Sequence, residues 1–282
     1  MAAQPMSQRP QVGTFTTVEV VAQLRESADR FANLVPRITD EAAVSPHLPD
    51  WPVSEIVRHV TILPDYYQEI AAGNAELIDE ATDMASKNTQ NIARIEGLSL
   101  SECAEHMIHG IDAFCRVVEA DDGQSLVDFH AGSTGTLTQI AAIAVGEYEV
   151  HGLDLAAALG VPWQIERNGA AMCILGALPV AGTQWLDAEA VAGHSGSYRI
   201  KLRGGSGAVH VSFSDGAARI CGSPDTAASE PASTLISADP VAFLKVFYRR
   251  QSQWAAIARA QMLSYGTKPL RALTLKDKFL PI

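Results

Sequence analysis

The sequence has 282 residues, of which 47% are hydrophobic and 19% charged, and its formal net charge is -11 at pH 7. A chain of this length has enough apolar residues for two folded domains. Its acidic balance argues against nucleic acid or a membrane surface as the partner. The four cysteines stand apart with no C-x-x-C pair, which indicates free thiols and a cytoplasmic location.

Helical periodicity dominates the first half of the sequence. Apolar residues recur at helical spacing in four segments, residues 16–34, 52–66, 101–119 and 138–159. Gly160 and Pro162 follow the fourth segment, as expected for a helix end. Four such helices predict an antiparallel bundle over residues 16–160. The more polar stretch 69–97 is expected to form either a helix that borders a cleft or a partly mobile loop.

The pattern changes after Pro162. A helix is expected over residues 169–187. Residues 168–186 carry no charge, but their alanines and glycines and Pro179 favour a core helix or a packing surface between domains over a membrane span. Apolar residues then alternate with polar ones, which predicts an antiparallel sheet covered by helices. The expected strands are 197–203, 208–213, 218–221 and 233–236, and the expected helices 239–247 and 251–265. The chain is therefore predicted to be a two-domain α+β protein, divided into residues 14–163 and 164–282.

Glu147 and His151 lie four residues apart within the fourth helix, so they share one face. A carboxylate and an imidazole in an apolar bundle are costly unless something compensates them. A divalent metal would do so, with His59 of the second helix as the best third ligand. The alternative is a buried polar pair beside a core histidine. Asp154, one turn after His151, either orients that ligand or lies on the helix surface.

Two stretches carry a resemblance to a known family. Residues 51–59, Trp-Pro-Val-Ser-Glu-Ile-Val-Arg-His, and residues 147–160, which begin with the E-x-x-x-H pair, resemble the mycothiol-dependent maleylpyruvate isomerase family. This resemblance implies a DinB-like four-helix bundle followed by a small domain similar to sterol-carrier domains. The clearest piece of the second domain is residues 239–250.

The resemblance also implies a set of site residues. His59, Glu147 and His151 would bind a divalent metal, usually zinc in the family. Arg250 matches a family arginine that follows a glycine, although Arg249 stands in the glycine's place here. Arg94 is the best match for a second family arginine that contacts the thiol cofactor or the substrate.

These residues imply an enzyme in which the metal activates mycothiol or a similar low-molecular-weight thiol. The thiolate would add to a small electrophilic or carboxylate substrate, either for cis-trans isomerisation of maleylpyruvate-like acids or for thiol S-transfer. We expect a monomer or homodimer. Two alternatives stay open, namely a non-catalytic protein that binds a lipid or another hydrophobic ligand, and a protein whose metal is only structural.

Overall fold

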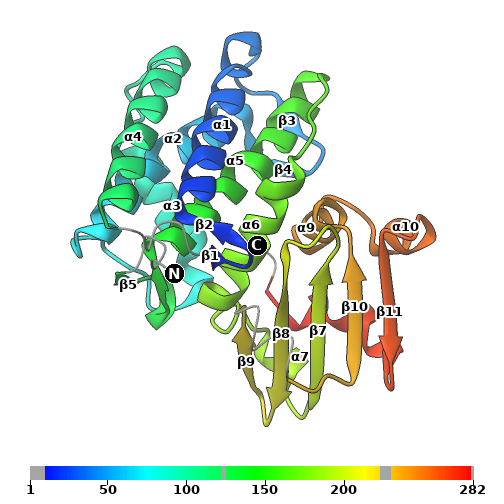
Figure 1. Cartoon of the computed structure of the whole chain (residues 1–282). Coiled ribbons are helices and arrows are strands. Elements are labelled where there is room, and N and C mark those ends of the chain that lie inside the picture. The colour runs from blue at the N-terminus through cyan, green and yellow to red at the C-terminus, as the bar shows by residue number, and fades with distance from the viewer. Residues whose placement is uncertain (1–9, 122–124, 223–229, 281–282) are drawn as a thin grey trace, which may run out of the picture.

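The computed structural model describes residues 10–121, 125–222 and 230–280. Helices form the first part of the chain and a five-stranded sheet lies in the second part (Figure 1). This arrangement confirms the predicted α+β class with a helical N-terminal region. No helix within the described residues is both long and apolar enough to cross a bilayer.

Four long helices form the N-terminal bundle. They are α1 Thr17–Ala32, α2 Val53–Ala71, α4 Leu100–Ala120 and α5 Leu137–Leu159. Helix α1 packs against α4 and α5, and α2 packs against the same two helices, so all four share one apolar core. Helices α1, α4 and α5 each begin with a capping box, in which a serine or threonine side chain and a glutamate or glutamine satisfy free backbone amides.

Helix α6, Arg167–Ala181, lies between the bundle and the sheet (Figure 1). It packs closely against α5 because glycines stand where the helices meet. A Cβ at Gly146 would lie 2.2 Å from Cys173 Sγ, and one at Gly176 would lie 2.9 Å from Ala142 Cβ. Helix α6 also contacts α9, Pro240–Phe247, so it joins the two parts of the chain. The division at residues 163 and 164 therefore stays a prediction.

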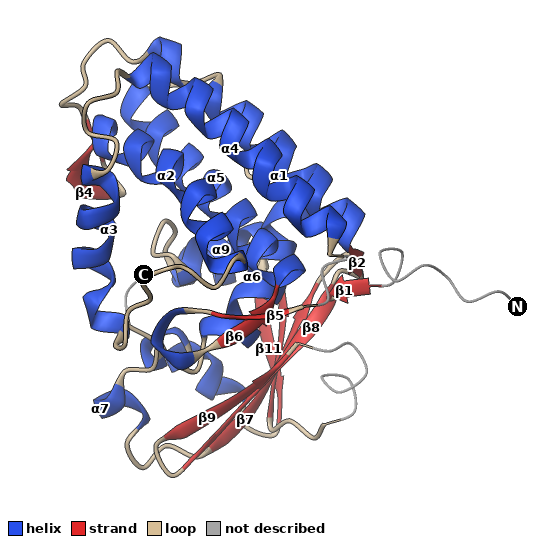
Figure 2. Cartoon of the chain, turned by 90° about the vertical axis from the view of Figure 1, so that its left-hand side faces the viewer, coloured by secondary structure: helices blue, strands red, loops and turns tan. Residues whose placement is uncertain are grey.

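The sheet has the strand order β11-β10-β7-β8-β9. Its strands are β7 Gly196–Leu202, β8 Gly207–Ser214, β9 Ala217–Cys221, β10 Thr234–Ala238 and β11 Met262–Gly266. All pairs are antiparallel except β10 with β7, which are parallel. Helices lie beside one face of the sheet (Figure 2).

The predicted helix over residues 251–265 is wrong in its second half. Helix α10, Gln253–Ala258, is short, and Ala260 then adopts a positive φ of 53°. The chain continues as β11, which pairs with β10 at the edge of the sheet. Backbone pairing with the edge of β10 stabilises a strand here, although the apolar residues of this segment are spaced as in a helix.

The remaining elements are short. They comprise α3 Met84–Ala93 and α7 Ala188–Val191, the strands β1 Pro10–Val12, β2 Phe15–Thr16, β3 Val44–Ser45, β4 Leu48–Pro52, β5 Leu126–Asp128 and β6 Thr134–Thr136, and the 3-10 turns Val35–Arg37, Ala81–Asp83, His130–Gly132, Pro269–Thr274 and Lys276–Lys278. Helix α3 packs against α2, so part of the polar stretch 69–97 is helical.

Candidate metal centre

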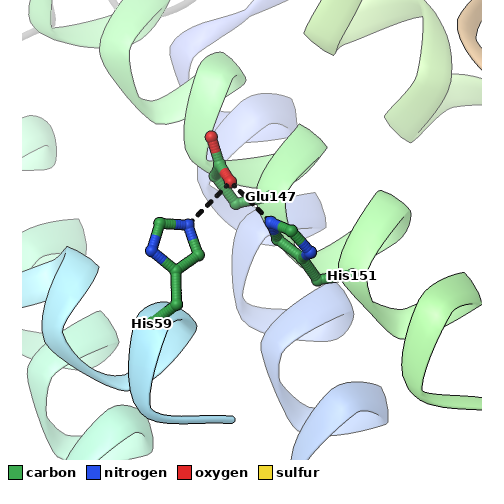
Figure 3. A group of neighbouring side chains, drawn as sticks. All are labelled: His59, Glu147 and His151. Carbon is green, nitrogen blue, oxygen red and sulfur yellow. Dashed lines mark ion pairs between the residues drawn. The ribbon is translucent and has the colours of Figure 1, made fainter. Parts of the chain in front are cut away.

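The structure brings His59, Glu147 and His151 together. His59 lies on α2, and the other two lie one turn apart on α5 (Figure 3). Glu147 Oε2 is 3.5 Å from His59 Nε2 and 3.4 Å from His151 Nε2. One ligand atom from each residue lies within 4.8 Å of the other two. The three side chains thus converge on one point, as the sequence predicted.

Trp51, at the end of β4, packs against both imidazoles. Its ring is stacked with that of His151, with a centroid distance of 6.2 Å and an interplanar angle of 6°. It meets the His59 ring edge-on at 5.2 Å. This packing limits the rotation of both histidines, so their nitrogens are held in place before any ligand arrives.

Asp154 connects His151 to the second part of the chain. Its side chain is completely buried, and Oδ2 lies 3.3 Å from His151 Nδ1. The Arg250 guanidinium donates to the same carboxylate from Nη2 at 2.7 Å and from Nε at 3.1 Å. Asp154 is therefore not on the helix surface, because its carboxylate lies between His151 and Arg250.

Arg249 stands where the family resemblance would place a glycine. It is exposed and adopts a φ of 61°, the left-handed conformation that glycine reaches without strain. The backbone before Arg250 therefore has a conformation that a glycine would reach more easily than an arginine. The neighbouring arginine consequently reaches Asp154.

Burial and ion pairs set the charge states at the centre. Burial alone would raise the pKa of Glu147, but hydrogen bonds with His151 and His59 lower it well below its usual range. Burial lowers the pKa of His59. For His151 the carboxylates of Asp154 and Glu147 outweigh burial and raise the pKa to about 9. The two carboxylates therefore favour a positive charge between the three side chains.

A cavity of about 510 Å³ opens from this group, and its walls come from both parts of the chain. Trp51 and Arg250 line it beside the three converging residues, as do Lys87 and Asn91 of α3. Arg94 does not line it, and its guanidinium is paired with Glu69 instead. The structure thus brings Arg250 to the centre but not Arg94.

Sequence patterns missed three polar residues of the cavity. Lys87, Asn91 and His130 are buried and line it. His130 stacks on Tyr66, with ring centroids 5.4 Å apart, in a turn that lacks any recognisable motif. Only the expectation that residues 69–97 border a cleft pointed to this side of the cavity.

The donor set fits a divalent metal. Two imidazole nitrogens and one carboxylate oxygen are a common ligand set of catalytic zinc, and they leave a coordination position open. The carboxylate of Asp154 on the far nitrogen of His151 is the partner that such ligands usually have. The cavity beside them is large enough for small organic molecules.

Comparisons with known proteins bear on the fold and on the family of the N-terminal part. The model of the mycothiol maleylpyruvate isomerase N-terminal domain matches residues 24–156. The chain is similar to the crystal structure of the mycothiol-dependent maleylpyruvate isomerase, with a TM-score of 0.52 and 15% identity, over 89% of this chain and 93% of that chain. A histidine-to-alanine mutant of that isomerase gives the same TM-score of 0.52 and 14% identity over the same 89% and 93%.

These structural likenesses show a shared fold, since the identities are low. No curated protein matches the sequence. The family model covers the positions of His59, Glu147 and His151. The match over residues 24–156 therefore supports the resemblance to the mycothiol-dependent maleylpyruvate isomerase family that the sequence suggests.

Proposed function

We propose that this protein is a metal-dependent enzyme that activates mycothiol, or a similar low-molecular-weight thiol, for addition to an electrophilic substrate. The convergence of His59, Glu147 and His151 at the wall of a cavity carries the proposal. The family of the N-terminal domain and the shared fold support it. Zinc is the expected ion because the ligands are two imidazoles and a carboxylate.

A bound divalent metal would supply the positive charge that lowers the pKa of a coordinated thiol, so that it is nucleophilic at neutral pH. The chain's own residues would prepare the centre. Asp154 holds His151 with Nε2 directed at the centre, and Arg250 holds Asp154. Trp51 packs over both imidazoles and limits the access of water.

The first test measures bound metal and thiol binding. The wild type should contain one equivalent of a divalent metal by mass spectrometry and should bind mycothiol in a calorimeter. Glu147→Gln should lose both. His106→Ala is the matched control, because His106 also contacts a carboxylate, that of Asp65 at 2.7 Å, but lies outside the cavity lining. A wild type without metal, or a Glu147→Gln variant that retains it, would refute the proposal.

The fate of the thiol distinguishes the two reactions. An isomerase returns the free thiol after each turnover, whereas an S-transferase consumes it in proportion to the electrophile. Titration of free thiol during the reaction therefore separates cis-trans isomerisation of maleylpyruvate-like acids from thiol S-transfer. Cytoplasmic location and a monomeric or homodimeric state remain part of the proposal.

The second candidate is a non-catalytic protein that binds a lipid or another hydrophobic ligand beside a structural metal. The mostly apolar cavity lining favours it. A hydrophobic compound in an organic extract of the purified protein, together with no thiol binding, would select this candidate. The same experiment tests whether the second part of the chain binds a hydrophobic ligand, as its predicted similarity to sterol-carrier domains suggests.

A further inference from the structure

The cavity has one apolar side that the metal chemistry does not require. Phe243 and Phe247 of α9, Phe279 and Trp185 line it, and we call these four residues the aromatic wall. The rings of Phe243 and Phe247 are stacked at 6.0 Å, and Phe247 meets Phe279 at 5.3 Å. Three of the four are buried, so the wall is rigid and has a definite shape.

Helix α6 completes this side of the cavity. Ile174, Ala177, Leu178 and Ala181 line it at helical spacing. The two alanines are only partly buried, whereas most residues of this helix are fully buried. Small side chains at these two positions line the same cavity as the aromatic wall. A ring or a branched alkyl group would bury apolar surface there.

The cations that line the cavity already have carboxylate partners. Arg250 is paired with Asp154, which is completely buried. Lys87 Nζ is 3.0 Å from Glu76 Oε2, and its ammonium lies over the Tyr66 ring at 5.7 Å. Among the described residues, no other lysine or arginine lines the cavity. A substrate with two carboxylates would therefore have to compete for both cations.

We propose that the electrophilic substrate of this site is an apolar compound with an aromatic or branched group and at most one negative charge, bound between α6 and the aromatic wall. This inference rests on the proposed function, because it names the second substrate of the same centre. A substrate with one negative charge would pair with Lys87, because the present partner of Lys87, Glu76, is largely exposed and binds it weakly. A small dicarboxylate would leave the aromatic wall uncovered.

The test compares two alkenes that react with thiols. The uncharged aromatic enone benzylideneacetone and the dicarboxylate maleate are titrated into the metal-containing protein, and binding is followed by tryptophan fluorescence, because Trp185 and Trp51 line the cavity. The enone should bind at least tenfold more tightly than maleate. Maleate binding that is equal or tighter would overturn the inference.

Variants of α6 locate the binding site. Ala177→Leu and Ala181→Leu each add a branched side chain to the space beside the aromatic wall, and either should weaken enone binding about tenfold. Ala188→Leu, on the exposed surface of α7, is the matched control and should leave it unchanged. Circular dichroism selects the folded variants. Enone binding that neither folded variant affects would place the compound elsewhere and refute the inference.

Thiol binding separates this inference from the proposed function. If the wild type binds the enone between α6 and the aromatic wall but binds neither metal nor mycothiol, the proposed function fails while the apolar site stands. If metal and mycothiol bind and maleate is preferred, the function stands and the substrate class is wrong.

Discussion

Replacing Asp154 by asparagine should weaken both the fold and the metal site. The substitution removes the negative charge opposite Arg250, whose side chain is only 7% exposed, and Asp154 itself is completely buried. Burial alone would raise the pKa of the Asp154 carboxyl. The contacts with His151 and Arg250 outweigh this effect and lower the pKa below its usual value, so the group is charged at neutral pH. Removing one partner of a buried ion pair costs about 3–5 kcal/mol.

The asparagine keeps part of the hydrogen bonding, worth about 1 kcal/mol. We therefore expect the free energy of unfolding to fall by about 2–4 kcal/mol in urea denaturation. Glu119→Gln is the control, because Glu119 pairs with Arg25 at 2.8 Å on the surface, with 44% and 35% of the side chains exposed. An exposed pair contributes at most about 1 kcal/mol.

Metal affinity supplies the second measurement. Asp154 holds His151 through Nδ1, and loss of such a partner lowers affinity by about 10–100-fold. Competition with a chromogenic chelator would measure this for the folded Asp154→Asn variant and the Glu119→Gln control. An Asp154→Asn variant with wild-type metal affinity would refute the orienting role of Asp154, whatever its stability.

Three further substitutions test the structure around the cavity. Gly146→Ala should lower the free energy of unfolding by about 1–3 kcal/mol, since its Cβ would lie 2.2 Å from Cys173 Sγ. Recovery of stability in the Gly146→Ala/Cys173→Ala double variant would confirm the clash. Unchanged stability of the single variant would contradict it. Burial lowers the pKa of His130 to about 4, so the unfolded chain binds more protons between pH 4 and 6.5 and stability falls as the pH drops through this range, by about 2 kcal/mol at pH 5. His130→Gln should remove this part of the pH dependence in urea titrations at pH 7 and 5, and an identical slope would disprove it. Arg249→Gly should raise the unfolding midpoint, because glycine relieves about 1 kcal/mol of strain at a φ of 61°; a lower midpoint would show that the Arg249 side chain contributes more than its backbone costs.

The bundle and the converging residues could be predicted because they depend on local spacing. Apolar periodicity located all four long helices, and the i, i+4 spacing placed Glu147 and His151 on one face of α5. His59 followed from the apolar face of α2 and from the family resemblance. Placing Glu147 beside His151 needed only local spacing, whereas joining His59 to them also needed the family resemblance.

The failures concern residues whose environment is set by distant parts of the chain. From the sequence, Glu149 is expected to be solvated, because it lies two residues from both Glu147 and His151 and so faces away from them on a helix. In the structure it is fully buried, because Ser27 donates to it at 2.8 Å and Arg30 approaches within 3.2 Å. Arg94 matched a family arginine only loosely, and tertiary packing placed Lys87 in the cavity lining instead. Neither outcome can be read from spacing within one helix.

The Asp154 carboxylate makes the metal centre depend on both parts of the chain. His151 comes from the bundle, Arg250 follows α9, and the carboxylate between them is fully buried. A shift of the second part that moved Arg250 would leave Asp154 without its counter charge and would change the hydrogen bonding of a metal ligand. The same part supplies the phenylalanines of the aromatic wall. Substrate packing against that wall and the geometry of the centre are therefore coupled through α9, so the bundle alone should bind metal more weakly than the whole chain.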